Sequence, residues 1–267
     1  MNKQANSRHM PPNTATFHGS AGRIERLARK AYGATMRGLG IVPFPVVAQG
    51  ARFWVDTVDY IDQCLAFDGM WEAPQLEELA AVCKSRHIDC FLDVGANAGF
   101  YSVMFAIKNL TDRIVAFEPD PGNYARLAAN LAANGLTKCV DARKVALGDK
   151  AAEVLLYEGA RWNRGESTIA EPDQTPKEFV HRVRQVRFDD EFAFAGQSLL
   201  IKMDVEGYEF SVLAGMERTL KENACFLQVE LYSERLEELK SLFAGLGYRF
   251  LRTEYIDHFF TNMPDIG

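Results

Sequence analysis

The sequence predicts an α/β protein built on a largely parallel sheet. Two observations lead to this fold class: short apolar runs alternate with amphipathic segments from residue 90 onward, and the first run passes through a glycine turn into a helix. Strand, helix and strand in succession are typical of a parallel sheet covered by helices. The 267 residues, 48% of them hydrophobic, suffice for one large domain with an N-terminal extension.

The chain divides into three parts. Residues 1–22 are polar and aperiodic, which predicts a disordered N-terminal tail. Residues 23–86 predict a helical N-terminal extension, with helices over 59–67 and from Pro74 onward. Residues 87–267 then form the main domain.

Within the main domain, strands and helices alternate. We expect strands at 90–94, 113–117, 144–147, 153–157, 185–188, 198–205, 224–231, 248–252 and 257–262. Helices are expected over 98–108, after Asp120-Pro121, along the apolar positions 210, 213, 216 and 220, and from Ser233 to about 245. Asp120 suits the N-cap of its helix and Pro121 the first helical position.

Composition limits the classes of partner. Thirty Lys and Arg against 36 Asp and Glu give a net charge of −6, so nothing global favours a polyanion and no nucleic-acid partner is predicted. Five cysteines without a CxxC pair indicate neither a disulfide framework nor a cysteine zinc site, which predicts a cytoplasmic protein. We expect no membrane span. The sequence leaves open whether the chain forms a homo-oligomer.

The glycine turn at Asp93-Val-Gly-Ala-Asn-Ala-Gly99 follows a buried strand and begins a helix. Glycines allow close approach of the backbone, and a helix N-terminus favours a negative or polar ligand group. The turn departs from the dinucleotide fingerprint because Asn97 stands at the second glycine position. A pyrophosphate would therefore fit poorly.

Glu118 ends the next strand, 23 residues after Gly95. A carboxylate at this place can accept both hydroxyl protons of a ribose. Together the turn and the carboxylate predict a site for adenosine without a diphosphate.

These segments resemble class I S-adenosylmethionine-dependent methyltransferases of the FkbM family. The resemblance runs from Trp71-Glu72 to Asn262 and lies in DVGANAGFYS (93–102), AFEPDPGNYARLAANLAANG (116–135), VALGD (145–149), VRFDD (186–190) and IKMDVEGYE (201–209). It implies a Rossmann-like seven-stranded, mostly parallel sheet with helices on both faces and the last strand antiparallel. It also implies that residues 87–267 bind S-adenosylmethionine and O-methylate a hydroxyl of a sugar, glycan or secondary metabolite.

The resemblance also implies which residues bind the cofactor. The expected set is Glu72, Asp93, Gly95, Ala96, Asn97, Gly99, Ser102, Glu118, Pro119, Ala146, Leu147 and Asp204. The residues of the glycine turn are expected at the methionine end, Glu118 at the ribose, and Ala146 and Leu147 beside the adenine. Glu72 is expected to close over the cofactor, or else to cap the helix that begins near Pro74.

The segment 201–209 carries the predicted catalytic residues. In a strand, Lys202, Asp204 and Glu206 would project to one face at the edge of the sheet where α/β proteins bind ligands. Glu206 is the first choice for the general base and Asp204 the second, with His181 and His258 as weaker alternatives.

A structural role is the alternative for the same segment. Lys202 and Asp204 would then form an internal ion pair, while Glu206 and Glu209 serve the next helix. Asp204 and Glu230 are two scattered carboxylates rather than a compact ligand set, so no metal is predicted.

Two other functions stay open on the residues alone: a nicotinamide-dependent oxidoreductase, which Asn97 disfavours, and a non-catalytic cofactor-binding module, which would not need the ionisable residues at 202–206. The long polar segment 158–182 predicts a functional loop, with 162–169 as a lid on the acceptor side.

Overall fold

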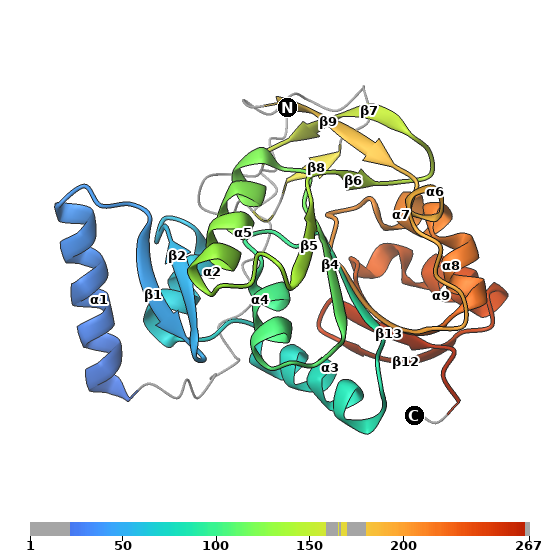
Figure 1. The fold of residues 1–267 in the computed structure, drawn as a ribbon, viewed down its shortest axis with the longest axis horizontal. Coiled ribbons are helices and arrows are strands. Elements are labelled where there is room, and N and C mark those ends of the chain that lie inside the picture. Colours follow the sequence, from blue (N-terminus) through green and yellow to red (C-terminus); the bar gives the residue numbers. More distant parts are fainter. Residues whose placement is uncertain (1–21, 159–164, 166, 170–179, 265–267) are drawn as a thin grey trace, which may run out of the picture.

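A seven-stranded sheet forms the centre of the computed structural model, which describes residues 22–158, 165, 167–169 and 180–264 (Figure 1). Its strand order is β12-β13-β11-β10-β3-β4-β5. The strands are β3 (Cys90–Val94), β4 (Arg113–Phe117), β5 (Val140–Arg143), β10 (Ser198–Met203), β11 (Ala224–Glu230), β12 (Arg249–Glu254) and β13 (Asp257–Thr261). Only β13 runs antiparallel to its neighbours within this sheet, so the predicted seven-stranded, Rossmann-like arrangement with an antiparallel last strand is confirmed.

Helices cover both faces of the sheet. One face carries α3 (Ala73–Ser85), α4 (Phe100–Ile107) and α5 (Pro121–Ala133), and the other carries α6 (Phe188–Glu191), α7 (Glu209–Gly215), α8 (Glu217–Glu222) and α9 (Leu236–Gly245). Alternate residues of β3 serve the two cores, since Phe91 packs with the first group and Leu92 with the second. No helix of the described residues is long and apolar enough to cross a membrane.

Three predicted helices are present, one as expected and two with altered bounds. Asp120 caps α5 as predicted: its Oδ1 accepts the N–H groups of Gly122 and Asn123 at 2.8 and 2.9 Å. The helix predicted along positions 210–220 is divided into α7 and α8 at Met216. The last long helix begins at Leu236, after a 3₁₀ turn over Ser233–Arg235, rather than directly at Ser233.

The N-terminal extension contains a β-hairpin that the helical prediction missed. Between α1 (Arg23–Gly38) and the short helices α2 (Tyr60–Gln63) and η1 (Cys64–Asp68) lie β1 (Phe44–Ala48) and β2 (Ala51–Val55). Side chains of α5 and the residue after it pair with the outer edge of β2: the Oδ1 atoms of Asn130 and Asn134 each accept a hydrogen bond from a backbone N–H of β2, at 2.8 Å. These partners lie 82 and 76 residues along the chain, so no local pattern signals the pairing.

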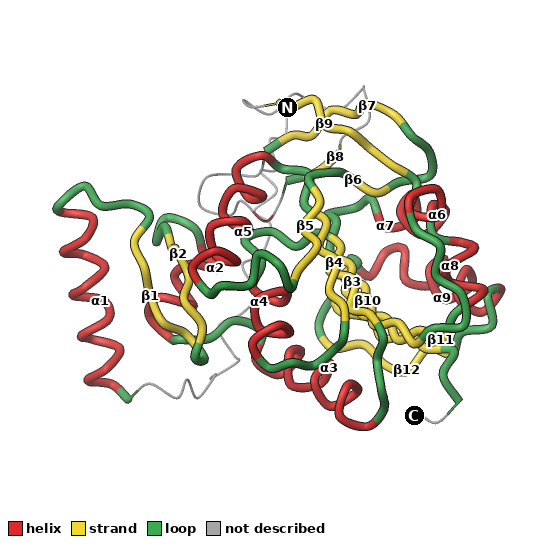
Figure 2. Tube along the Cα trace, viewed as in Figure 1, coloured by secondary structure: helices red, strands yellow, loops and turns green. Residues whose placement is uncertain are grey.

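A second sheet lies across the carboxyl ends of the central strands (Figure 2). It has the order β6-β9-β7-β8, with β6 (Ala146–Leu147), β7 (Ala152–Tyr157), β8 (Thr168–Ile169) and β9 (Val180–Val186). The prediction that residues 144–147 form a strand of the central sheet is therefore wrong. The central sheet uses 140–143 instead, and Ala146 and Leu147 pair with β9. Most of the predicted tail, residues 1–21, lies outside the described residues.

Candidate functional site

The turn after β3 is fixed by a very close backbone contact. Gly95 has φ +83°, and a Cβ there would lie 1.7 Å from the backbone oxygen of Asp204. The N–H groups of Gly95 and Ala96 both donate to the carbonyl of Phe117, at 3.0 and 2.9 Å. Only glycine fits this position, because any side chain would push the turn after β10 away. The contact joins the turns after β3, β4 and β10.

Glu118 is held beside this turn by two backbone donors. Its Oε2 accepts the N–H of Asn97 at 2.7 Å, and its Oε1 accepts the N–H of Asp120 at 2.8 Å. Burial raises the pKa of Glu118 to about 8, although both hydrogen bonds oppose the shift. Each carboxylate oxygen keeps a second lone pair. Glu118 can therefore accept two further hydroxyl protons from a ligand.

Part of the predicted cofactor set lies behind the turn. Asp93 is buried at the end of β3, and its Oδ2 accepts the N–H and the hydroxyl of Ser102 at 3.1 and 2.6 Å. A Cβ on Gly99 would lie 2.3 Å from Leu127, so Gly99 permits close packing of α4 against α5. These three residues tie β3 to the start of α4 and do not line the pocket described next.

A pocket of about 590 Å³ opens in front of the turn. Seven of the predicted residues line it: Gly95, Asn97, Glu118, Pro119, Ala146, Leu147 and Asp204. Gly165, Ser167 and Ile169, from the predicted lid, also line it, and the sequence analysis did not assign Asn123, Leu156, Val205 and Tyr208 to the site. Val205 and Tyr208 lie within the motif 201–209, of which the sequence analysis considered only the ionisable residues. Most of the others come from segments that only the second sheet or α5 brings to this place.

Within the predicted lid, part of the chain contacts the site. The Thr168 hydroxyl donates to the backbone oxygen of Glu206 at 2.8 Å, and Ser167 lies 3.5 Å from a carboxylate oxygen of Asp120. Residues 162–164 and 166 lie outside the described residues, so the lid stays a prediction.

Lys202 stands at the centre of a group of carboxylates. Its side chain is buried, with Nζ 3.2 Å from Asp204 Oδ2 and 4.9 Å from the centroid of the Tyr101 ring. Burial alone would lower the pKa of Lys202, but the carboxylates, Asp204 and Glu72 foremost, outweigh it and raise the pKa. Lys202 is therefore a permanent positive charge. The ion pair expected under the structural alternative is present.

Glu72 lies near enough to Lys202 for their charges to interact, and it does not line the first pocket. The Tyr101 hydroxyl donates to Glu72 Oε2 at 2.6 Å. Burial raises the pKa of Glu72 to about 7, against the lowering effect of Lys202. The residue occupies the N-cap position of α3, but its side chain makes no capping hydrogen bond. Its backbone φ of +40° turns the chain into the helix.

The turn after β10 forms a second pocket. The strand ends at Met203 and Glu206 has φ +51°, so the alternation predicted for 202, 204 and 206 does not continue through Glu206. Glu209 Oε1 accepts the N–H of Gly207 at 2.8 Å. The pocket holds about 540 Å³ and is lined by Glu206, Gly207, Glu209, Glu230, Leu231, Tyr232, Glu234 and Arg235.

The two pockets meet at a group of three carboxylates. Oxygens of Asp204, Glu206 and Glu230 all lie within 4.8 Å of one another, with Asp204 lining the first pocket and the two glutamates the second. Sequence reasoning treated Asp204 and Glu230 as scattered, and that expectation was wrong. Glu230 ends β11, which pairs with β10, so the sheet brings together residues 26 positions apart in sequence.

The histidines make other contacts. His258 is buried in β13, where Nδ1 lies 2.8 Å from the Thr253 hydroxyl and Nε2 2.9 Å from the Leu231 carbonyl oxygen. His181 Nε2 lies 2.5 Å from Glu158. Neither histidine lines either pocket.

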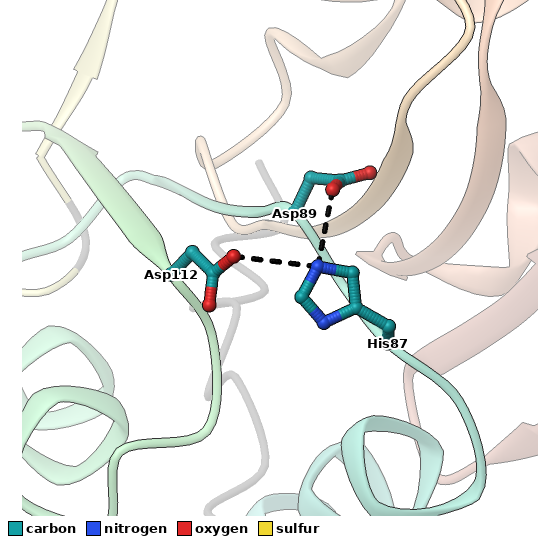
Figure 3. Close-up of side chains that lie close together, drawn as sticks. All are labelled: His87, Asp89 and Asp112. Atoms are coloured by element: carbon teal, nitrogen blue, oxygen red, sulfur yellow. Dashed lines mark ion pairs between the residues drawn. The ribbon is translucent and has the colours of Figure 1, made fainter.

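Another ionisable cluster, apart from that of His181, Glu158 and Asp120, lies at the opposite edge of the sheet. His87 Nε2 lies 3.2 Å from Asp89 and 3.3 Å from Asp112, just before β3 and β4 begin (Figure 3). His87 and Asp112 are exposed and Asp89 is half-buried, and the pockets follow the carboxyl ends of these strands. The cluster is therefore separate from the candidate site.

The geometry of the glycine turn and the buried Glu118 agrees with the comparison to protein families. A family model described as "Methyltransferase FkbM domain" matches residues 93–250, more than half of the chain. The chain belongs to the FkbM methyltransferase family. Its fold is Rossmann-like, and membership of this family argues against the oxidoreductase alternative.

Some solved structures resemble this chain at low sequence identity. An FkbM methyltransferase from Methylobacillus flagellatus KT is 18% identical, with a TM-score of 0.48 over 76% of this chain and 55% of its own. The human methyltransferase 10 domain containing protein is 11% identical, with a TM-score of 0.48 over 90% of this chain and 97% of its own. An rRNA methylase from Streptococcus thermophilus is 10% identical, with a TM-score of 0.41 over 70% of this chain and 92% of its own.

The chain thus spans little more than half the length of the first of these structures. A search among curated proteins finds no significant match.

Proposed function

We propose that this protein is an S-adenosylmethionine-dependent O-methyltransferase that acts on a hydroxyl of a sugar, glycan or secondary metabolite. The observation that carries the proposal is Glu118, a buried carboxylate at the end of β4 that lines a pocket and keeps lone pairs for two ribose hydroxyls.

The residues present fit the adenosine part of the cofactor. Gly95 and Asn97 line the pocket, so a ligand held there lies against the turn after β3. Pro119, Ala146 and Leu147 give the pocket an apolar wall suited to a flat base, and Glu118 lines the same pocket. When bound, S-adenosylmethionine would supply the methyl group of its positively charged sulfur. The methyl group would be transferred to the acceptor oxygen, and the electron pair of the broken bond would stay on sulfur.

The chain's own residues then have distinct tasks. Glu206 accepts the proton of the acceptor hydroxyl, because it lines the second pocket next to Asp204, where the two pockets meet. Lys202 forms an ion pair with Asp204 at 3.2 Å and holds that side chain where the two pockets meet. Asp93 and Ser102 position the start of α4 behind the turn, and they act as positioning residues.

The charge of the second pocket supports a small-molecule or glycan acceptor over a nucleic acid. Glu206, Glu209, Glu230 and Glu234 all line it. A phosphate backbone would meet this group of carboxylates unfavourably, and the whole chain carries a net charge of −6.

The test is Glu206→Gln, which keeps the shape of the side chain but cannot take a proton. We expect turnover to fall about 100-fold or more, while the affinity for S-adenosylhomocysteine, measured by calorimetry, stays within twofold. Glu153→Gln, an exposed site on β7, removes the same charge away from both pockets and serves as the control. Acceptors come from a methyl-transfer screen with labelled cofactor over glycans and natural-product alcohols.

Near-normal turnover of Glu206→Gln would remove Glu206 as the base. Asp204 would then be the next residue to test. Failure of the wild-type chain to bind S-adenosylhomocysteine would contradict the proposed cofactor itself.

A further inference from the structure

We infer that the second pocket binds a positively charged group of the acceptor, so that the substrate is an alcohol carrying a protonated amine, such as an amino sugar or an amino alcohol. This inference rests on the proposed function and deepens it by naming the substrate class.

The lining of the pocket has an excess of negative charge. Four glutamates line it against one cation, Arg235. The Arg235 guanidinium is already engaged, because it donates two hydrogen bonds of 2.9 Å to Glu238 and lies 3.8 Å from the centroid of the Phe210 ring. On the inner side, Lys202 is paired with Asp204. Both cations beside the pocket therefore already have carboxylate partners.

Glu209 gives the independent sign of a missing ligand. Its side chain is 1% exposed, and Oε1 accepts the Gly207 N–H. Oε2 is also buried, and no described residue donates a hydrogen bond to it. A buried carboxylate oxygen without a donor is costly, and an ammonium group carries three donors and the opposite charge. A protonated amine in the pocket would satisfy both the orphan oxygen and the charge.

Neighbouring groups are consistent with this reading. Burial raises the pKa of Glu209, and burial together with the nearby Asp204 raises the pKa of Glu230. The groups facing them are Asp204, Lys202, Glu72, Asp257 and Arg235. Only two of these five are cations, and both have carboxylate partners already.

The position of the pocket explains why the amine would belong to the acceptor. Glu206 and Glu230 line the second pocket, and their carboxylates lie within 4.8 Å of Asp204, which lines the first. A substrate held by its amine at Glu209 and Glu230 thus has its nearby hydroxyl beside Glu206. Such a charge anchor restricts the orientation of the reacting oxygen, which is a large part of catalysis by alignment.

An organic cation suits this pocket better than a divalent metal ion. Leu231 and Tyr232 form part of its wall, and a divalent ion prefers oxygen ligands on all sides, whereas an organic cation also packs against apolar and aromatic groups. A divalent ion at the three carboxylates would also lie close to the buried Lys202 ammonium, which repels it.

The experiment compares matched ligands that differ in charge. Ethanolamine and glucosamine are titrated into the full chain by calorimetry at pH 7.5 with S-adenosylhomocysteine present, beside N-acetylethanolamine and N-acetylglucosamine. We expect at least one amine to bind tenfold or more tightly than its N-acetyl partner. Glu209→Gln, which keeps an acceptor for Gly207, should abolish that preference and leave S-adenosylhomocysteine affinity within twofold, and Glu153→Gln should preserve both.

Glu230→Gln provides a second variant if Glu209→Gln fails to fold. Equal binding of amine and N-acetyl partners, or no binding of any of the four, would overturn the inference. Tight binding of Mg²⁺ or Mn²⁺ that Glu230→Gln removes would overturn it in favour of a metal site. In each of these cases, the proposed function is retained if the wild-type chain binds S-adenosylhomocysteine. If the wild-type chain does not bind S-adenosylhomocysteine, the proposed function itself is contradicted.

Discussion

The ionisation of Glu118 should control the affinity for the ribose. The carboxylate form accepts two hydroxyl protons better than the neutral acid, and burial raises the pKa of Glu118 to about 8. With that value, about 3% of the free chain is ionised at pH 6.5 and about 76% at pH 8.5. A ligand that requires the carboxylate should therefore bind about 25-fold more tightly at pH 8.5, a difference of about 1.9 kcal/mol.

Adenosine is the suitable ligand, because it carries the ribose but no group that titrates in this range. We expect its affinity, measured by calorimetry, to rise with pH, and protons to be released on binding at pH 7. The sign follows from the raised pKa: ribose contacts stabilise the charged form and lower the pKa in the complex. Dideoxyadenosine, which lacks both hydroxyls, is the matched ligand control and should bind with little dependence on pH.

Glu118→Gln is the matched variant of the protein. It should bind adenosine more weakly and without the rise between pH 6.5 and 8.5, since no carboxyl group remains to titrate. Equal affinity of the wild-type chain for adenosine across this range would refute the reasoning, as would the same pH dependence in the Gln variant. The second result would assign the titration to another group, Glu72 being the nearest in pKa.

Three further changes have separate expected outcomes. Glu118→Ala should weaken S-adenosylhomocysteine binding by about 1.5 to 3 kcal/mol, and calorimetric affinity within twofold of wild type would contradict the ribose role. Gly95→Ala places a methyl group 1.7 Å from the Asp204 backbone oxygen at φ +83°, so thermal melting should show a loss of about 3 kcal/mol or more, and an unchanged melting temperature would argue against the contact. Asp189→Ala removes the acceptor for two N–H groups at the start of α8, at 2.8 and 3.0 Å. Urea unfolding should report a loss of about 2 kcal/mol with cofactor affinity unchanged, and equal loss of both would indicate a wider rearrangement.

Local signals predicted the centre of the sheet well. β3 and β4 have the predicted bounds, because each is a continuous apolar run between polar turns, and the Asp120 cap follows from its own sequence. The residues around Gly95 and Glu118 were found for the same reason. Both lie on consecutive strands of one βαβ unit, so their spacing in sequence reflects their spacing in the fold.

Features that depend on distant segments were not accessible in this way. The hairpin of β1 and β2 is completed by side chains of α5, and the second pocket combines the turn after β10 with residues 230–235. The strand alternation assumed through Glu206 failed because a positive φ there turns the chain. The orphan oxygen of Glu209 is visible only when every donor around it is known.

The contact between Gly95 and Asp204 also divides the site into parts that engineering can and cannot vary. A Cβ at position 95 would meet the backbone oxygen of Asp204, so a library that randomises this position would consist mostly of damaged proteins. Tyr232 and Glu234, on the outer wall of the second pocket, take no part in this contact. Variation directed at these two positions is the route by which acceptor preference could be redesigned while the cofactor turn stays intact.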